Sequence, residues 1–169
     1  MSADPGDLTD VFVSGGSNID AAINIKQAVA GLREEFGDLS ISRVYRSPAV
    51  GFEGDDFLNL VIGFKTDRSP HDCAAVMTRL EEAAGRTDDQ HGFTARPLDL
   101  DMVLYGDLVD DDPVLRLPRD DVEKYAFVLA PLTELAPSFV HPVTGKTIDD
   151  MWNEFDQGSV TMTVEALGL

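Results

Sequence analysis

The order of two hydrophobic periodicities along the chain constrains its fold more than any other feature of the sequence. Segments with period-two alternation or a continuous apolar run, typical of strands, are interspersed with segments whose apolar residues recur at helical spacing. Glycine, proline or polar residues separate the segments. These patterns predict strands over 10–16, 39–46, 57–66 and 96–106, and helices over 19–36 and 70–84. The predicted order is therefore β-α-β-β-α-β.

This order is that of the ferredoxin-like α+β fold, in which helices pack on a mostly antiparallel sheet. After this core the sequence predicts a hairpin-like stretch near 108–117 and a C-terminal helical extension, with helices near 126–135 and 147–156. No linker or internal repeat divides the 169 residues, a length that suits one domain. We expect residues 1–169 to form that single domain.

Acidic residues greatly outnumber basic ones. Thirty-one Asp and Glu against 13 Lys and Arg give a formal net charge of −18, which disfavours binding to nucleic acid or to anionic membranes. No apolar run approaches the roughly 20 residues that span a bilayer, and the acidic start is unlike a signal peptide. The lone Cys73 fits a reducing compartment. We expect a cytoplasmic monomer, and leave open whether its acidity is an adaptation to high salt.

The segment RPLDLDMVLYG (96–106) places two carboxylates in an apolar strand. Strict alternation assigns Asp99 and Asp101 to one face, their Cα atoms about 6.5–7 Å apart. The same alternation puts Val103 and Tyr105 on that face, and on the core face Leu98, Leu100, Met102 and Leu104. Two such carboxylates repel each other unless a cation lies between them, and their oxygens suit Mg²⁺ shared with substrate phosphates. By spacing alone a solvent-facing strand is the simpler explanation, but Arg96 beside them favours a phosphate site.

A second group of residues surrounds the loop between the second and third predicted strands. Phe57 and Asn59 lie two residues apart, so an aromatic face and an amide would line one pocket, as recognition of a heterocyclic ring requires. Periodicity alone places Phe57 in the core instead. Glu81 and Arg86, at the end of the second predicted helix, are equally compatible with an exposed ion pair. None of these signals is specific when taken singly.

Six motifs in order resemble the 6-hydroxymethyl-7,8-dihydropterin pyrophosphokinase family over nearly the whole chain. They are VSGGSN, SRVYRSPAVG, DFLNLVIGF, LEEAAGR, ARPLDLDMVLYG and FVLAPLTELAP. The resemblance implies a ferredoxin-like fold, a cytoplasmic enzyme of folate biosynthesis, and ATP as co-substrate. The implied reaction moves the terminal pyrophosphate of ATP onto the pterin's hydroxymethyl group and leaves AMP. It also implies small-molecule partners only, with neither nucleic acid nor membrane.

The resemblance also implies roles for individual residues. Asp99 and Asp101 match the aspartates that hold two Mg²⁺ ions, and together with Arg86 and Arg96 they form the expected catalytic set. The residues expected to bind the pterin are Gly16, Ser47, Pro48, Val50, Phe57, Asn59 and Phe127. Those expected to bind ATP are Glu81, Arg86, Arg96, Arg119 and Lys124.

The departures from the family pattern lie on the nucleotide side. Arg119 stands where the family usually has histidine, and Tyr125 where it has arginine; the adjacent Lys124 supplies a charge without the guanidinium fork. Asp88 and Asp89 place negative charge in a loop expected near the triphosphate, at a cost that salt would screen. Three alternatives stay open: an active pyrophosphokinase, a diverged homologue that keeps a pterin-like pocket but has altered or lost ATP-dependent activity, and a ferredoxin-like binding module without catalysis.

Overall fold

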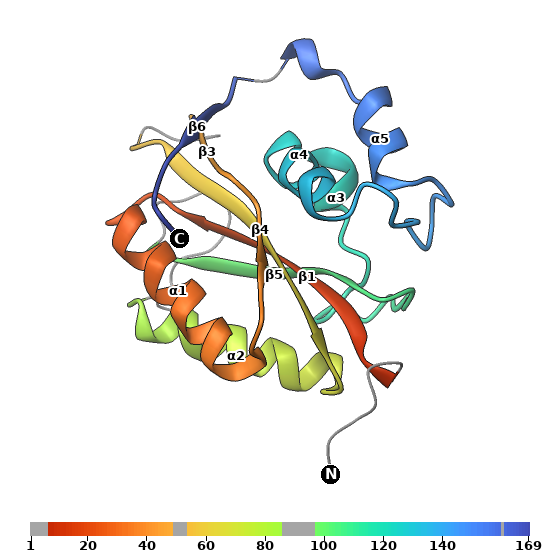
Figure 1. The fold of residues 1–169 in the computed structure, drawn as a ribbon, viewed down its shortest axis with the longest axis horizontal. Coiled ribbons are helices and arrows are strands. Elements are labelled where there is room, and N and C mark those ends of the chain that lie inside the picture. Colours follow the sequence, from red (N-terminus) through yellow and green to blue (C-terminus); the bar gives the residue numbers. More distant parts are fainter. Residues whose placement is uncertain (1–6, 49–53, 86–96, 160) are drawn as a thin grey trace.

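The structure is a computed structural model that describes residues 7–48, 54–85, 97–159 and 161–169 (Figure 1). Its strands are β1 (Thr9–Ser17), β2 (Ser40–Ile41), β3 (Val44–Ser47), β4 (Phe57–Thr66), β5 (Asp99–Tyr105) and β6 (Thr163–Glu165). Its helices are α1 (Ala21–Phe36), α2 (Pro70–Ala83), α3 (Asp121–Lys124), α4 (Ala126–Leu135) and α5 (Ile148–Glu154), followed by the 3-10 turn η2 (Gln157–Ser159). Every element that the periodicities predict is present.

The sheet has the predicted topology. Its strand order is β5-β1-β4-β3-β6, with β2 pairing separately with β4, and the recorded pairings are antiparallel. The fourth predicted strand thus lies beside the first, which lies beside the third, as in a ferredoxin-like sheet. Near the end of the hairpin-like stretch, Asp110 and Leu117 exchange two backbone hydrogen bonds. The prediction of a ferredoxin-like α+β core is confirmed.

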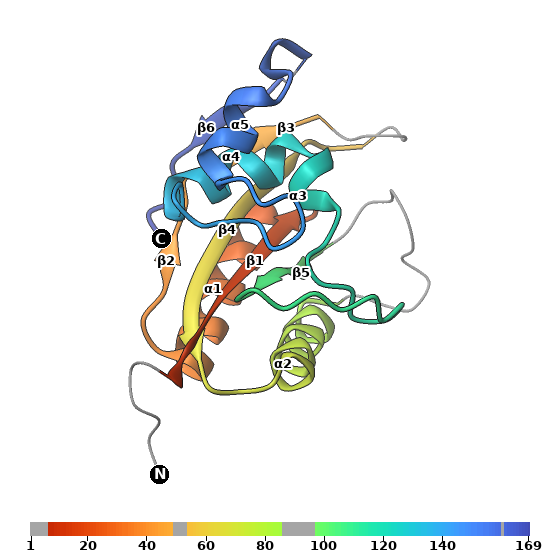
Figure 2. The same ribbon diagram turned by 90° about the vertical axis from the view of Figure 1, so that its right-hand side faces the viewer.

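Helices cover both faces of this sheet (Figures 1 and 2). On one face, α1 and α2 pack over two clusters of buried side chains that include Val13, Leu60 and Met77. On the other face, α3, α4 and α5 pack over a third cluster, built around Val61 and Leu129. The C-terminal extension is therefore part of the domain's core, and its face of the sheet is the one on which the candidate site lies.

A bulge in β5 changes which face its residues occupy. Phe12 of β1 pairs with Leu104, but Val13 pairs with Met102, which leaves Val103 as the extra residue. A β-bulge is a place where two residues of one strand lie opposite one residue of its partner. Beyond the bulge, the side chains of the bulged strand point to the opposite faces from those that strict alternation predicts. Val103 and Leu104 are consequently both buried toward α4, whereas Tyr105 packs toward α2. The prediction of strict alternation was correct through Met102 and wrong for Leu104 and Tyr105.

The remaining differences from prediction are short elements. The predicted strand 39–46 is divided into β2 and β3 at Ser42, whose hydroxyl accepts a hydrogen bond from the Val61 N–H over 2.9 Å. The strand β6 pairs with the outer edge of β3, and Glu165 forms an ion pair with Arg46 at 2.5 Å. Neither β6 nor the single-turn helix α3 carries enough hydrophobic pattern to have been predicted.

Candidate active site

A row of three residues crosses three neighbouring strands at the centre of the candidate site. Gly16 of β1 lies directly opposite Asn59 of β4 on one side and opposite Asp99 of β5 on the other. Directly opposed residues of antiparallel strands share one face of the sheet, about 4.5–5.5 Å apart. Val61, two residues beyond Asn59, packs under α4, which identifies that face. The row therefore brings a residue of the predicted pterin pocket next to a predicted metal ligand.

The Asn59 end of the row is buried and polar. Asn59 and Ser47 are both buried, and the Asn59 amide donates from Nδ2 to Ser47 Oγ over 3.1 Å. A Cβ atom on Gly16 would stand only 2.8 Å from Asn59 Oδ1. Glycine is thus the residue that lets the backbone of β1 approach this amide so closely. Three of the predicted pterin residues meet at this point.

Aromatic rings lie on both elements that border this pocket. Phe57 is opposite Ser47 in the β3–β4 pair, and so shares its face of the sheet. Phe127 lies in the first turn of α4, and both phenylalanines are half-buried rather than core residues. Tyr125 stacks on Phe127, with ring centroids 4.9 Å apart and an interplanar angle of 17°. Pro48 follows β3 and is exposed.

The two aspartates of β5 form the other end of the row. Asp99 and Asp101 share a face, as predicted, and the Asp101 side chain is 29% exposed. Burial, and after it the negative charge of Asp99, raise the pKa of Asp101 from its ordinary value to about 7. The neighbouring Arg119 acts in the opposite direction but does not outweigh them. The pair is therefore a site where one more positive charge is strongly favoured.

Arg119 supplies positive charge to this end of the site. Its backbone N–H donates to the Val103 carbonyl over 3.0 Å, which fixes the residue beside β5. Its Nη1 lies 3.8 Å from Asp101 Oδ1, and its Nη2 lies 3.7 Å from Asp121 Oδ1. Its Nε is buried and has no hydrogen-bond partner among the described residues. The structure thus brings Arg119, which was predicted to bind ATP, directly to the aspartates.

The aspartate pair fits a divalent cation that is shared with a substrate. The guanidinium 3.8 Å from Asp101 already occupies the role of a counter-cation. In the part of the chain that the structure describes, no set of three or more His, Cys, Asp or Glu side chains is placed to hold a metal ion. Mg²⁺ commonly takes just one or two carboxylates and completes its shell with water and substrate phosphates. Asp99 and Asp101 suit that mode of binding.

Two other residues that were predicted to bind the nucleotide have clear partners. Glu81, on α2, accepts a hydrogen bond from the Leu100 N–H over 2.9 Å, between the two aspartates. Because β5 is an edge strand, this carboxylate holds the outer edge of the strand against α2. Lys124 lies on α3, is exposed, and forms an ion pair with Asp120 at 3.5 Å.

Some of the residues named in the sequence analysis lie outside the described ranges. They are Val50, Arg86, Asp88, Asp89 and Arg96.

One residue that contributes to the site was not predicted from the sequence. The missed residue is Ser17, which is fully buried and donates from Oγ to the Pro97 carbonyl over 2.5 Å. This bond ties the end of β1 to the entrance of β5. The only signal for it in the sequence is its place in the GGSN motif.

The sequence of the chain matches a known protein family. A family model described as 7,8-dihydro-6-hydroxymethylpterin-pyrophosphokinase (HPPK) matches residues 12–137, most of the chain. The chain belongs to the HPPK family. The match includes the whole row from β4 to β5, together with Arg119 and Phe127.

Curated HPPK relatives match the chain over nearly its full length. One is the 2-amino-4-hydroxy-6-hydroxymethyldihydropteridine pyrophosphokinase of Aquifex aeolicus (strain VF5), 32% identical over 145 residues, which are 85% of this chain and 90% of the relative. The enzyme of the same name from Methylorubrum extorquens is 32% identical over 157 residues, 90% of this chain and 98% of the relative.

Solved structures with the same fold are more distant in sequence. A Plasmodium falciparum HPPK-DHPS chain, solved with pterin and p-hydroxybenzoate, superimposes with a TM-score of 0.69 at 13% identity, covering 87% of this chain. Another HPPK-DHPS chain, solved in complex with substrates, gives a TM-score of 0.70 at 10% identity. The present chain spans only 43% and 44% of those two chains, so the likeness shows a shared HPPK fold.

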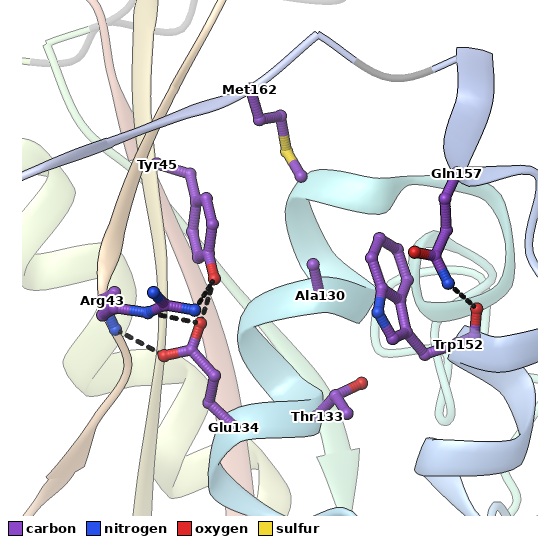
Figure 3. Close-up of a pocket in the computed structure, with 8 residues that line it drawn as sticks. All are labelled: Arg43, Tyr45, Ala130, Thr133, Glu134, Trp152, Gln157 and Met162. Atoms are coloured by element: carbon purple, nitrogen blue, oxygen red, sulfur yellow. Dashed lines mark hydrogen bonds and ion pairs between the residues drawn. The ribbon is translucent and has the colours of Figure 1, made fainter.

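The described part of the chain also has a hollow of about 360 Å³ between β3, α4 and the C-terminal segment (Figure 3). It is lined by Arg43, Tyr45, Ala130, Thr133, Glu134, Trp152, Gln157 and Met162. None of the predicted site residues lines it, so it is separate from the candidate active site.

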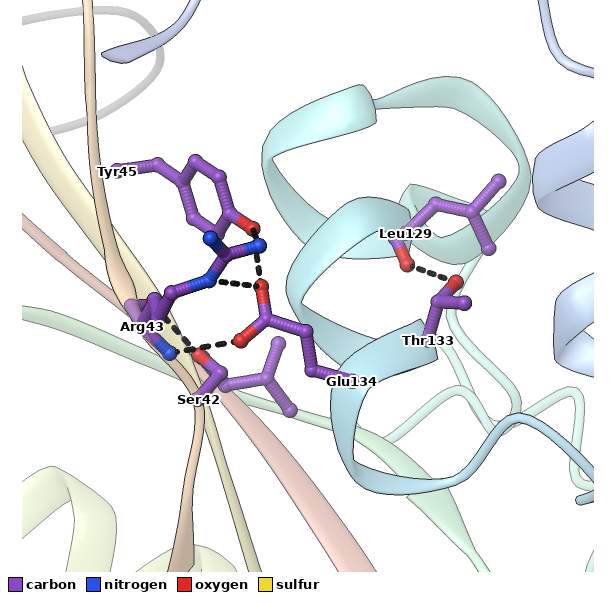
Figure 4. A network of polar contacts seen from close by, with 7 residues as sticks. Ser42, Arg43, Tyr45, Leu129, Thr133 and Glu134 are labelled. Carbon is purple, nitrogen blue, oxygen red and sulfur yellow. Dashed lines mark hydrogen bonds and ion pairs between the residues drawn. The ribbon is translucent and has the colours of Figure 1, made fainter. Parts of the chain in front are cut away.

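Polar groups at the edge of this hollow bind one another (Figure 4). Glu134 accepts the Arg43 backbone N–H at 2.9 Å and also the hydroxyl of Tyr45, and its carboxylate pairs with Arg43 Nε at 3.3 Å. Burial, followed by the hydrogen bond to Glu134, raises the pKa of Tyr45 to about 12. The three side chains thus connect the β3 region to α4 and hold α4 over the sheet.

Proposed function

We propose that this chain is an ATP-dependent diphosphotransferase of folate biosynthesis. It transfers pyrophosphate from ATP to 6-hydroxymethyl-7,8-dihydropterin and produces AMP and the pterin diphosphate. The observation that carries the proposal is the row Asn59–Gly16–Asp99, because it joins a buried amide pocket to a carboxylate pair within three adjacent strands. A transferase that must bring a heterocycle to a metal-bound phosphate needs these two features side by side. None of the comparisons favours the alternative of altered or lost activity.

We infer the roles of the residues at the pterin end from their contacts. The Asn59 amide, oriented by Ser47, offers a hydrogen-bonding edge to the heterocycle, and Gly16 lets the ring approach the backbone of β1. Phe57 and the face of Phe127 away from Tyr125 would enclose the ring by stacking. We propose that Pro48, which directly follows β3, and Val50 also contact the ring.

At the phosphate end, Asp99 and Asp101 would hold Mg²⁺, and we propose two ions. When bound, the metal supplies charge neutralisation and orientation of the triphosphate. Arg119 adds a guanidinium to this end, and we propose that Arg86, Arg96 and Lys124 contribute further positive charge toward the nucleotide. Glu81 acts as a positioning residue, because its carboxylate holds the β5 backbone between the two aspartates.

The transfer itself is balanced without a covalent enzyme intermediate. The pterin's hydroxymethyl oxygen forms a bond to the β-phosphorus while the bond from that phosphorus to the oxygen bridging to the α-phosphorus breaks. AMP leaves with the bond's electron pair, and the hydroxyl proton is released. Phosphoryl-type transfer of this kind depends on positioning and charge stabilisation more than on a nucleophilic side chain.

We further propose that residues 1–169 act as a single monomeric domain in the cytoplasm. The three described clusters of buried side chains all pack against one sheet, which favours one domain. Among the described helices, none has the length and apolar character that crossing a membrane requires.

The test is product analysis of purified protein with MgATP and 6-hydroxymethyl-7,8-dihydropterin, at low and at high salt. We expect AMP and the pterin diphosphate in equal amounts in at least one condition. Absence of AMP in both, with pterin binding still measurable, would contradict the proposal in favour of the diverged homologue. Absence of both AMP formation and pterin binding would instead favour the binding module without catalysis.

A further inference from the structure

We propose that Arg119 is a resident counter-cation of the metal-binding carboxylates. In this view the guanidinium competes with a divalent metal ion for Asp101, and it turns to the anionic co-substrate once the metal has taken that carboxylate. Metal alone would therefore bind weakly, and metal together with the nucleotide would bind well. The part that concerns the nucleotide rests on the proposed function, whereas the competition for Asp101 does not.

The first support is the way Arg119 is held. Its main chain is fixed by the hydrogen bond to the Val103 carbonyl, two residues from Asp101 along β5. Its side chain is shared between Asp101 at 3.8 Å and Asp121 at 3.7 Å. These distances are longer than the 2.7–2.9 Å of a close bidentate pair. The guanidinium therefore neutralises both carboxylates without being committed to either.

The second support is an unused donor. The Arg119 Nε is buried and has no hydrogen-bond partner among the described residues, even though the whole side chain is 37% exposed. A buried donor without a partner carries a desolvation cost, which a bound acceptor would remove. The guanidinium fork matches the oxygens of a phosphate group, so an anionic phosphate ester is the chemical class that satisfies this donor.

The third support is the charge arithmetic of Asp101. An Mg²⁺ ion bound to a carboxylate lies about 2.0–2.1 Å from the carboxylate oxygen. This is much closer than the 3.8 Å between Arg119 Nη1 and Asp101 Oδ1. Two cations on one carboxylate repel each other, so the metal and Arg119 cannot share Asp101 at full strength. Asp121 and the backbone anchor keep Arg119 nearby after it is displaced.

A metal titration tests the competition directly. Free Mn²⁺, used alone as the probe, is measured by electron paramagnetic resonance in wild type, Arg119→Gln and Arg116→Gln. Arg116 is the matched control, because it loses the same charge from the same segment but pairs with the exposed Asp120 at 3.6 Å and not with Asp101. The Asp101→Asn protein defines which binding belongs to the site, since a chain of net charge −18 will bind Mn²⁺ elsewhere as well.

We expect Arg119→Gln to bind Mn²⁺ roughly two- to fivefold more tightly than wild type, which is the upper part of the range for an exposed ion pair. Arg116→Gln should change the affinity by less than about twofold. With MnATP as the probe the order should reverse, and Arg119→Gln should bind several-fold more weakly than wild type. Equal Mn²⁺ affinity in wild type and Arg119→Gln would overturn the competition. Tighter Mn²⁺ binding without weaker MnATP binding would overturn only the role toward the nucleotide.

A measurement on the wild-type protein covers the case in which Arg119→Gln does not fold. Arginine Nε–H resonances are followed by ¹⁵N-resolved NMR during titration with Mg²⁺ alone, and Arg119 is assigned with the conservative variant Arg119→Lys. Displacement predicts that the Arg119 resonance shifts with the same midpoint as metal binding, and that Asp101→Asn abolishes the shift. An Arg119 resonance that does not respond to Mg²⁺ would overturn the proposal, whether or not the enzyme produces AMP.

Discussion

Gly16 lies opposite Asn59 so closely that a Cβ atom on residue 16 would stand 2.8 Å from Asn59 Oδ1. The amide in turn is held by Ser47 Oγ. The orientation of the amide that we propose to bind the pterin thus depends on the absence of a side chain on the neighbouring strand. The same glycine is opposite Asp99, so the two ends of the site are connected through one residue of β1.

Gly16→Ala should therefore weaken pterin binding at least tenfold, because the new methyl group forces the Asn59 amide away from Ser47. The crowding should also cost about 1–3 kcal/mol of unfolding free energy. Gly15→Ala is the control, since its methyl group would meet the flexible ends of Leu60 and Leu100 on the opposite face. Isothermal titration with the pterin checks both variants. Equal loss of pterin affinity in both would mean that the effect is a general one on stability.

Asp101→Asn should make the metal-free protein more stable. The folded-state pKa of Asp101 is raised, so folding favours its protonated form, and stability is lost as the pH rises from the ordinary value of 3.8 to about 7. Above pH 7 the amide should add about 1–2 kcal/mol, after allowance for the side chain's partial exposure. Urea unfolding at pH 8 and pH 5, without metal, checks this.

The gain from Asp101→Asn should shrink toward pH 5 and should be absent in Asp120→Asn, whose carboxylate is exposed and paired with Arg116 and Lys124. Added MgATP should stabilise the wild type but not Asp101→Asn. A variant that is less stable than wild type at pH 8 would indicate that the ion pair with Arg119 outweighs burial and the repulsion from Asp99.

His141 should make the protein sensitive to mild acid. It is fully buried, and its Nδ1 accepts hydrogen bonds from the Val143 and Thr144 N–H groups at 3.2 and 3.1 Å. Burial lowers its pKa below the ordinary 6.5, against a smaller opposite effect of Glu123. A lowered folded-state pKa means that the stability is present above pH 6.5 and is lost as the pH falls through the folded-state value.

The comparison is with His141→Asn, whose Oδ1 can accept the same two N–H groups but does not titrate. Below pH 6.5 the unfolding free energy of wild type should fall faster than that of the variant, by at most about 1.4 kcal/mol per pH unit, since one proton is involved. Urea unfolding from pH 7.5 to pH 5 measures both slopes. Parallel curves would show that His141 does not contribute.

Glu134→Gln should destabilise the fold without changing catalysis. The glutamate connects α4 to β3 through the Arg43 backbone and the Tyr45 hydroxyl, at the edge of the hollow between β3 and α4 (Figure 4). Losing one charged acceptor should cost about 1–2 kcal/mol. Glu154→Gln, which removes an exposed partner of Lys146, should cost less than about 0.5 kcal/mol. Thermal unfolding and steady-state kinetics on both variants separate an effect on stability from an effect on activity. A large rise in KM for Glu134→Gln would contradict a purely structural role for Glu134.

Much of this fold was predictable because its long elements have strong periodicity. The helices α1 and α2 each bury one face, and the central strands β1 and β4 are buried along nearly their whole length. The order of these elements leaves few alternatives to a ferredoxin-like sheet. The pairing of Asp99 and Asp101 on one face was predictable for the same reason. Resemblance to a known family, and not spacing, made a metal site the preferred interpretation of that pair over a solvent-facing strand.

What escaped prediction depends on contacts between distant segments. The bulge at Val103 arises where Phe12 pairs with Leu104, and no local pattern in the sequence of β5 predicts it. Strand β6 is a short segment that forms a strand only because it pairs with the edge of β3. The approach of Arg119 to Asp101 requires the backbone bond to Val103, which only the folded chain provides. The bulge and the position of Arg119 both lie at the aspartate end of the candidate site, whereas β6 lies at the opposite edge of the sheet.

The most direct test of the account is to separate turnover from pterin binding in Asp101→Asn. Asp101 is proposed to be a metal ligand at the phosphate end, and the pterin pocket is proposed to lie around Asn59, on the other side of Gly16. AMP formation with saturating MgATP should fall at least about 1,000-fold, while the pterin affinity, measured by titration without nucleotide, should change by less than about threefold. Retained AMP formation in a folded Asp101→Asn protein would contradict the account.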